Sequence, residues 1–222
     1  MKNIRTQVLL RFGSAPLVFG LIFFLPAGSF RFWEAWVYMG LILIPMFFIV
    51  LYFLKKDPTL LERRMRTREK EKEQYFLHAF FGLFVVAGFL LPGFDFRWHW
   101  SQVPIWLIVA AEILVFLGYM IFFLVMRENS YLSRTVEVDK GQPVITTGPY
   151  RVVRHPMYTA VLLMFFFTPI ALGSWWALIP MIPLPVILVL RILTEEKVLI
   201  KELSGYAEYR KTVRFRLIPY IW

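Results

Sequence analysis

The sequence predicts an all-α, polytopic integral membrane protein with about six transmembrane helices and a cytoplasmic C-terminal helix. Of its 222 residues, 59% are hydrophobic, which is too apolar a composition for a soluble domain of this size. The net charge of +10 would suit a nucleic-acid-binding protein. However, the lysines and arginines lie between long apolar runs, which is typical of a membrane protein. Membrane lipids, and not nucleic acid, are therefore the expected surroundings.

Four of the apolar runs make up the N-terminal region, residues 1–126. The first follows Arg11 and reaches Gly28. It is long and is followed at once by another apolar run, so we expect a retained span and not a cleaved signal peptide. The next three spans are expected at Phe32–Leu54, Tyr75–Pro92 and Pro104–Met126. Glu112, inside the last of these, is either a functional group or a hydrogen-bonded link between helices.

The C-terminal region, residues 127–222, contains a predicted helical hairpin with arms at Thr159–Leu172 and Ala177–Leu190. Both arms are shorter than the roughly 20 residues that cross a bilayer, so the pair is expected to tilt or to thin the membrane. The second helix is expected to run on to Leu203, to break at Gly205 and to resume at Tyr206. The tail has the composition of an interfacial anchor or of an amphipathic helix on the inner leaflet.

The basic residues predict the orientation. All lysines and arginines except Arg31 and Arg97 lie in the N-terminus, in the Lys55–Gln74 loop, in the connection 127–156 or in the tail. The positive-inside bias places these segments and both termini in the cytoplasm. In the loop, Asp57 precedes a proline, which predicts a helix start. The loop either fixes the topology or forms a surface helix on anionic lipid or a lid over a site.

The segment Gly148-Pro149-Tyr150-Arg151-Val152-Val153-Arg154-His155-Pro156-Met157-Tyr158 joins two apolar runs. Each of its two prolines removes a backbone donor and disfavours the α conformation in the residue before it, which predicts a shaped connection. The segment is cationic, aromatic and stiff, and so suits a small anionic or zwitterionic ligand. The alternative is a positive-inside loop with aromatic interface anchors.

A second group of charged residues follows the hairpin. Arg191 and Glu195 are four residues apart and share a helix face, with Glu196 beside them. Because the hairpin returns the chain to the side that it left, we expect this group to lie near His155 and Tyr158. The pocket would offer arginines to a carboxylate, glutamates to hydroxyl or ammonium groups, and aromatic faces to a cation. S-Adenosylmethionine presents all of these groups.

Composition also narrows the chemistry. The chain has no cysteine and three well-separated histidines, so neither disulfides nor a dedicated metal centre are expected. Methyl transfer from a sulfonium needs mainly proximity and alignment. A carboxylate acceptor is already ionised at neutral pH and needs no general base, which fits a sequence without an evident pair of base and nucleophile.

The two motifs, Gly-Pro-Tyr-Arg-x-Val-Arg-His-Pro-x-Tyr and Arg-x-x-x-Glu-Glu-x-x-Leu, resemble those of the isoprenylcysteine carboxyl methyltransferase family and its bacterial relatives. The resemblance covers about Gln142–Trp222, and a weaker likeness includes Asp57–Arg64. It implies a polytopic enzyme, in bacteria of the cytoplasmic membrane, that uses S-adenosylmethionine and a lipophilic acceptor. It also assigns Arg191 to the acceptor's carboxylate. The residues that it assigns to the cofactor are Gln142, Pro143, Val144, Ile145, Tyr150, His155, Pro156, Met157, Tyr158 and Glu195, with Glu196 as a helper.

Three other functions stay open at this point. A phospholipid amine N-methyltransferase would need a base, for which His155 is the nearby candidate. An NADPH-dependent sterol or enone reductase would need more cations for its cofactor's phosphates than Arg151, Arg154 and Arg191 offer. A transporter or scaffold would need ionisable groups along a path through the bilayer, and among the predicted spans only Glu112 qualifies.

Overall fold

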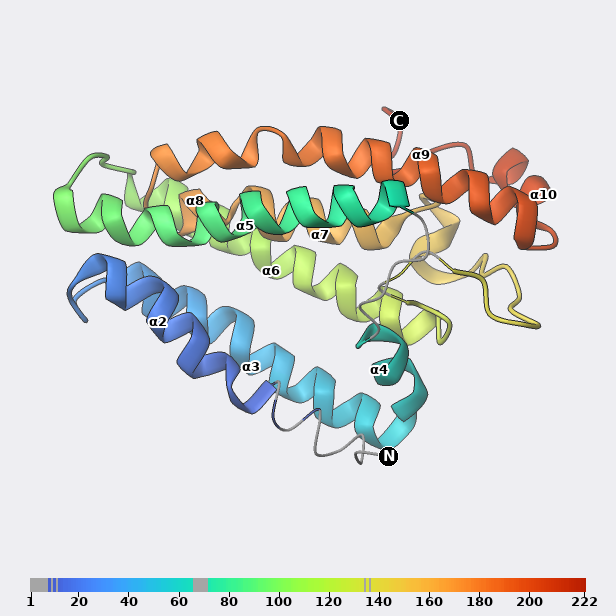
Figure 1. Ribbon diagram of the computed structural model, residues 1–222, viewed down its shortest axis with the longest axis horizontal. Coiled ribbons are helices and arrows are strands. Elements are labelled where there is room, and N and C mark those ends of the chain that lie inside the picture. The colour runs from blue at the N-terminus through green and yellow to red at the C-terminus, as the bar shows by residue number, and fades with distance from the viewer. Residues whose placement is uncertain (1–7, 9, 11, 66–71, 134, 136) are drawn as a thin grey trace.

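The computed structural model of the chain describes residues 8, 10, 12–65, 72–133, 135 and 137–222. All regular elements in this part of the chain are helices (Figure 1), as the composition predicted. They are α2 (Ala15–Ala27), α3 (Trp33–Lys56), α4 (Pro58–Arg64), α5 (Lys72–Trp98), α6 (Ile105–Glu128), η1 (Gly148–Arg151), α7 (Pro156–Phe166), α8 (Thr168–Ala171), η2 (Trp176–Met181), α9 (Leu184–Glu202) and α10 (Tyr206–Thr212). The N-terminal cations Lys2, Arg5 and Arg11 lie outside the described residues, as does part of the Lys55–Gln74 loop.

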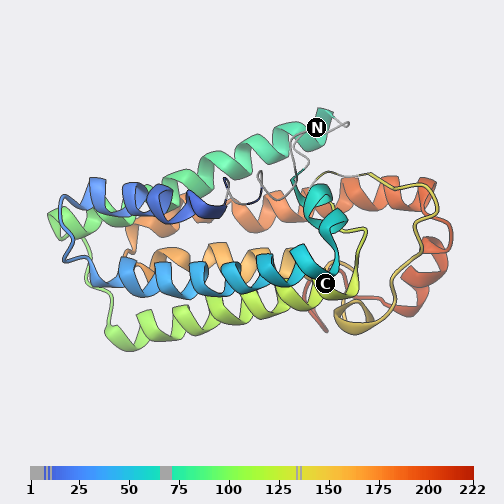
Figure 2. The same ribbon diagram turned by 90° about the horizontal axis from the view of Figure 1, so that it is seen from below.

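The long helices run back and forth along one axis of the molecule, so that the connections gather at its two ends (Figures 1 and 2). The α2–α3, α5–α6 and α8–η2 connections lie at one end. The other end, called the site end below, carries α4, the connection from α6 to η1, the start of α7 and α10. Along the bundle, α6 packs on α7 and α8, and α5 packs on α2, η2 and α9.

Four helical stretches among the described residues are long and apolar enough to cross a membrane. They are Trp33–Lys56, Tyr75–Trp98, Ile105–Glu128 and Trp176–Glu202. Two further apolar helices, Ala15–Ala27 and Pro156–Ala171, are shorter. An integral membrane protein is thus supported, whereas six crossings and their orientation stay predictions.

Two expected boundaries were wrong. The third span does not stop at Pro92 but continues to Trp98 with the proline inside the helix; membrane helices tolerate this because neighbouring groups satisfy the freed backbone. The second arm of the hairpin is not short, since its helical stretch covers the 27 residues Trp176–Glu202. The first arm is short, as expected, and the predicted helix after Asp57 is present.

Aromatic packing holds the middle of the bundle together. The ring of Phe89 on α5 lies 5.9 Å from that of Phe23 on α2, 6.1 Å from that of Tyr38 on α3 and 6.0 Å from that of Phe165 on α7. The buried hydroxyl of Tyr38 also lies 2.6 Å from Thr168 Oγ1 at the start of α8. These contacts join four helices around one core, and offset or edge-to-face ring pairs stabilise it beyond the area that they bury.

The end opposite the site is fixed by a buried carboxylate. Asp95 is 2% exposed and accepts hydrogen bonds from Ser101 N, at 2.8 Å, and from the hydroxyl groups of Ser101 and Ser174. It therefore joins α5 to the turn before η2. Glu112, for which a hydrogen bond between helices was one expectation, has a buried Oε1 without a hydrogen-bond partner among the described residues.

Candidate active site

A cavity of about 460 Å³ opens at the site end of the bundle, between α5, α6, α7, α9 and the connection that precedes η1. Its lining combines polar and apolar side chains. The polar ones are Arg64, His78, Asn129, Tyr131, Ser133, Thr135, Glu137, Gln142, Tyr150, Arg154, His155, Tyr158, Arg191, Glu195, Tyr206 and Tyr209. The apolar ones include Leu77, Phe81, Val161, Met164, Phe165, Ile187 and Leu188. A cavity of this kind can hold a polar group and a hydrocarbon chain together.

The central motif is a shaped connection, as predicted. It begins with the short turn η1, and Gly148 at its start has a φ of +56°. An added Cβ there would also lie 3.0 Å from the carboxyl of Glu128, so both backbone and space favour glycine. Pro156 then takes the first position of α7, where its missing N–H costs no helical hydrogen bond. The motif thereby directs His155 and Tyr158 into the cavity.

The C-terminal tail runs alongside the motif outside any regular element. Arg154 N donates to Phe215 O and His155 N to Arg216 O, both at 2.9 Å. Thr159 Oγ1 donates to Leu217 O at 2.7 Å. The tail thus satisfies backbone donors that the prolines leave outside regular helix.

Glu196 lies beneath the cavity as the centre of a buried ionic network and is 4% exposed. Its Oε1 accepts from Arg154 Nε at 2.7 Å and from Tyr206 Oη at 3.3 Å, and lies 3.3 Å from His155 Nε2. Its Oε2 accepts from Arg216 Nε at 3.0 Å. One carboxylate therefore joins the motif, α9, α10 and the tail, and satisfied networks of this kind fix a unique geometry.

Glu196 is not among the residues that line the cavity. All the other sequence-predicted site residues are: Gln142, Pro143, Val144, Ile145, Tyr150, His155, Pro156, Met157, Tyr158, Arg191 and Glu195. The structure therefore brings the two motifs together and separates the adjacent glutamates. Glu195 faces the cavity, while Glu196 faces the network behind it.

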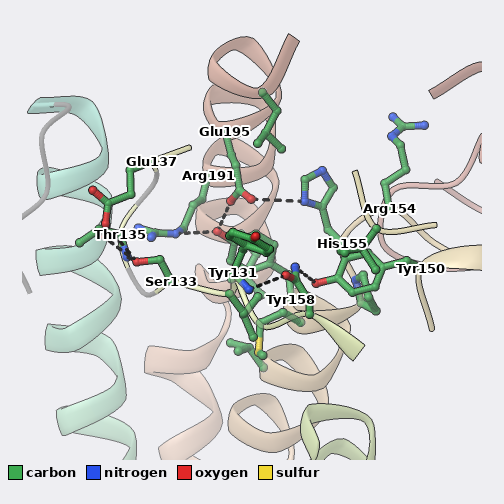
Figure 3. Close-up of a pocket in the computed structure, with 18 of the residues that line it drawn as sticks. Tyr131, Ser133, Thr135, Glu137, Tyr150, Arg154, His155, Tyr158, Arg191 and Glu195 are labelled. Carbon is green, nitrogen blue, oxygen red and sulfur yellow. Dashed lines mark hydrogen bonds and ion pairs between the residues drawn. The ribbon is translucent and has the colours of Figure 1, made fainter. Parts of the chain in front are cut away.

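Tyr158 connects Arg191 and Glu195, which both lie on α9 (Figure 3). Arg191 Nε donates to Tyr158 Oη at 2.8 Å, and Tyr158 Oη donates to Glu195 Oε2 at 2.5 Å. His155 Nδ1 lies 3.8 Å from Glu195 Oε1. The proximity expected from the hairpin is thus confirmed. These side chains set a guanidinium and a carboxylate at fixed positions in a partly buried site, where charge interactions are stronger than in bulk water.

Buried tyrosine hydroxyl groups form hydrogen bonds within and around the motif. Asn129 Nδ2 donates to Tyr150 Oη at 2.9 Å, and Tyr209 Oη donates to Tyr150 O at 2.7 Å. Burial raises the pKa of Tyr150, of Tyr206 and of Tyr209 well above the ordinary value for tyrosine. These phenols are therefore neutral at physiological pH and act as hydrogen-bonding groups, not as bases.

Sequence reasoning missed the irregular connection toward which the side chain of Arg191 points (Figure 3). Ser133, Thr135 and Glu137 lie on one side of the cavity, and Tyr150 and Arg154 lie on the other (Figure 3). Thr135 Oγ1 donates to Glu137 Oε1 at 3.0 Å, and Ser133 Oγ lies 3.4 Å from the same oxygen. His78 and Arg64 also line the cavity. No spacing pattern marks these residues, because they come from separate elements and an irregular connection.

Known proteins offer one comparison. Residues 106–205 match the model of a family described as phospholipid methyltransferase. That family consists of integral membrane methyltransferases related to the isoprenylcysteine carboxyl methyltransferases. The match includes α6, the motif, Arg191 and Glu195, and it supports a membrane methyltransferase. No curated protein matches the chain.

Among the residues that the structure describes, no group of three histidine, aspartate or glutamate side chains is arranged to hold a metal ion. The donor set of the cavity instead combines arginines, hydroxyl groups and two carboxylates with aromatic rings. This set of groups suits an organic zwitterion better than a metal ion. Guanidinium groups pair with carboxylates, and carboxylates pair with ammonium or hydroxyl groups.

Proposed function

We propose that this chain is an S-adenosylmethionine-dependent methyltransferase that methylates the carboxylate of a lipophilic acceptor at the cytoplasmic face of the membrane. The acceptor is an isoprenylcysteine-like or isoprenoid carboxylate. The observation that carries the proposal is the Arg191–Tyr158–Glu195 arrangement, which sets a cationic and an anionic group side by side in one cavity.

The residues present fit the cofactor. Glu195 is placed to accept from hydroxyl or ammonium groups, and the rings of Tyr158 and Tyr150 border the same cavity, where aromatic faces attract a sulfonium. The cofactor carries a charge of about +1 and its demethylated product is close to neutral. A carboxylate at Glu195 therefore favours the substrate over the product by Coulomb attraction.

Arg191 is the residue proposed to orient the acceptor. It is 8% exposed, on the α9 face that borders the cavity. Its guanidinium is held through Tyr158 at a fixed position, and a planar guanidinium binds a carboxylate in two parallel hydrogen bonds. Bound S-adenosylmethionine supplies an electrophilic methyl group. The protein then contributes alignment of the two reactants and exclusion of water, which suffices for an ionised acceptor.

The apolar residues of the lining fit the hydrocarbon part of such an acceptor. Phe81 on α5, Val161 and Phe165 on α7, and Leu188 on α9 line the same cavity as the polar groups. α5 and α9 belong to stretches long enough to cross the membrane. The acceptor can therefore keep its chain among apolar side chains while its carboxylate meets Arg191.

A phospholipid amine is the second candidate acceptor, and the description of the matching family favours it. Amine methylation requires loss of a proton before the nitrogen can attack, so a base is needed. The cavity holds Glu137 and His155 within its lining. Glu137 thus adds a candidate to the one that the sequence offered.

Calorimetric titration of the detergent-purified protein with S-adenosylmethionine, with its demethylated product and with NADPH tests the proposal. We expect the first two to bind, and Glu195→Ala to lose that binding. Glu202→Ala, an exposed glutamate on the same helix, is the matched control and should bind normally. Methyl transfer to an isoprenoid carboxylate and to phosphatidylethanolamine then identifies the acceptor. Binding of NADPH alone would overturn the proposal in favour of a reductase.

A further inference from the structure

The short helix α4 packs against the wall of the cavity, although it lies outside the segment that matches the family model. Figure 1 shows it next to the C-terminal end of α6. Asp57 caps the helix, with its Oδ1 accepting from Leu60 N at 3.1 Å. Leu60 and Leu61 are buried. The helix is therefore anchored on one side, which leaves Arg63 and Arg64 directed to the connection after α6.

Arg63 binds both ends of one loop of that connection. Its Nη1 donates to Ser130 O at 2.7 Å, and its Nε donates to Asp139 Oδ2 at 2.7 Å. Its guanidinium also lies 5.0 Å from the centre of the Tyr131 ring. One side chain thus closes the loop between residues 130 and 139. A bidentate, planar donor is suited to holding two acceptors at a fixed separation.

The loop and the residues after it, here called the strap (residues 130–133, 135 and 137–145), form one wall of the cavity. Asp139, the acceptor of Arg63, also shapes the next turn: Gln142 N donates to Asp139 O, and Asp139 N donates to Gln142 Oε1, both at 3.0 Å. That turn leads directly into Gln142–Ile145, the residues proposed to contact the cofactor. A hydrogen-bonded path therefore runs from α4 to the ligand-facing part of the strap.

Arg64 strengthens the same attachment from the neighbouring position. Its Nη1 donates to Ser133 O at 3.3 Å, and its guanidinium lies 5.5 Å from the centre of the Phe122 ring on α6. Ser133 Oγ in turn lies 3.5 Å from Arg63 O. Contacts of α4 thus reach four residues of the strap, namely Ser130, Tyr131, Ser133 and Asp139.

We propose that Arg63 is a positioning residue, because its hydrogen bonds to Ser130 and Asp139 hold the strap against the cavity. In this way α4 sets the affinity of the cavity for its ligand. The inference rests on the proposed function for the identity of that ligand. Without these two hydrogen bonds the loop regains conformational freedom, and part of the binding free energy is then used to order it. Arg63 itself does not line the cavity, so its effect acts through the strap.

The test compares the full-length wild-type protein with Arg63→Ala, Arg63→Lys and Asp139→Asn in two measurements. Amide hydrogen exchange of residues 137–145 without ligand reports on the strap. Calorimetric affinity and the KM for S-adenosylmethionine report on the cavity. Lys211→Ala is the matched control, because Lys211 and Glu208 form an ion pair of the same 2.7 Å length within α10, and both side chains are exposed.

In Arg63→Ala we expect faster amide hydrogen exchange at residues 137–145 but not at 206–212. Cofactor binding should weaken about tenfold, which is the usual cost of losing a hydrogen bond to a charged group. KM should rise while kcat at saturation is unchanged. Arg63→Lys should recover part of the affinity, since lysine keeps the positive charge but lacks the planar guanidinium that binds two acceptors. The control should match the wild type.

Unchanged exchange at 137–145 in Arg63→Ala would overturn the inference, and so would faster exchange with unchanged affinity. If the wild type itself fails to bind S-adenosylmethionine, the proposed function falls. The exchange measurement then still decides whether Arg63 holds the strap, so the two failures are distinguishable.

Discussion

Arg154 and Glu196, 42 residues apart in the sequence, form a buried ion pair with 2.7 Å between Nε and Oε1. Arg154 Nη1 also donates to Val213 O and Arg214 O, each at 2.8 Å. The pair thus joins three segments at the base of the candidate site. Removing either partner would leave the other as an uncompensated buried charge, which costs folding free energy.

Glu196→Gln should therefore destabilise the protein by about 3 kcal/mol, since glutamine keeps the shape of the side chain but leaves Arg154 without a balancing charge. Thermal unfolding in detergent measures this as a lower midpoint. Glu208→Gln, at the exposed pair with Lys211, is the control and should change little. An unaltered midpoint in Glu196→Gln would show that the network does not stabilise the fold.

Tyr158→Phe removes only the hydroxyl that joins Arg191 to Glu195. Hydrogen bonds to charged groups contribute about 1.5–3 kcal/mol, so kcat/KM for methyl transfer should fall about 10- to 100-fold while the thermal midpoint changes little. Tyr52→Phe removes a hydroxyl that accepts from exposed Lys56 and should leave transfer unchanged. Full activity in Tyr158→Phe would contradict the assigned role of the bridge.

Arg191→Ala should abolish methyl transfer with only a modest loss of cofactor affinity, because this guanidinium is proposed to bind the acceptor. Arg191→Lys should restore little methyl transfer, since an ammonium group lacks the planar pair of donors with which a guanidinium binds a carboxylate. Parallel calorimetry with S-adenosylmethionine and a transfer assay separate the two effects. Complete loss of cofactor binding in Arg191→Ala would move this residue to the cofactor's side of the site.

Gly118 allows α6 and α7 to approach closely. An added Cβ would lie 3.0 Å from Ala160 O, 3.0 Å from Leu163 Cβ and 2.8 Å from Met164 Cγ. Gly118→Val should therefore destabilise the protein by about 1–3 kcal/mol through overpacking.

Gly40→Val on α3 is the control for that experiment, because nothing lies within 4 Å of a Cβ at Gly40. Thermal unfolding of both variants in the same detergent gives the comparison. Equal midpoints for the two variants would show that the α6–α7 contact can relax without cost.

The long apolar runs were sufficient to predict the long helices, and the hairpin was sufficient to predict that the two motifs meet. The hairpin necessarily returns the chain to the side that it left, so Arg191 and Glu195 had to lie near Tyr158, as the 2.5 Å contact between Tyr158 and Glu195 confirms. Hydropathy could not give the end of the third helix, because the effect of Pro92 on a membrane helix depends on its neighbours.

The sequence also could not show which of the adjacent glutamates, Glu195 or Glu196, faces the cavity and which joins the buried network. Adjacent helical residues point about 100° apart, but which of them faces the cavity depends on where Arg154 and Arg216 lie. The tail supplies one of these arginines from outside any helix. The part of the strap before Gln142 was missed for a similar reason, since Arg63, which binds Asp139, is 76 residues away from it in the sequence.

The pairing of the tail with the central motif has a consequence for the order in which the pocket forms. Arg154 and Thr159 donate to carbonyl groups that lie 58 to 60 residues further along the chain. Contacts between such distant residues cost more loop-closure entropy than the hydrogen bonds within a helix. The helices can therefore form before the tail closes this part of the pocket.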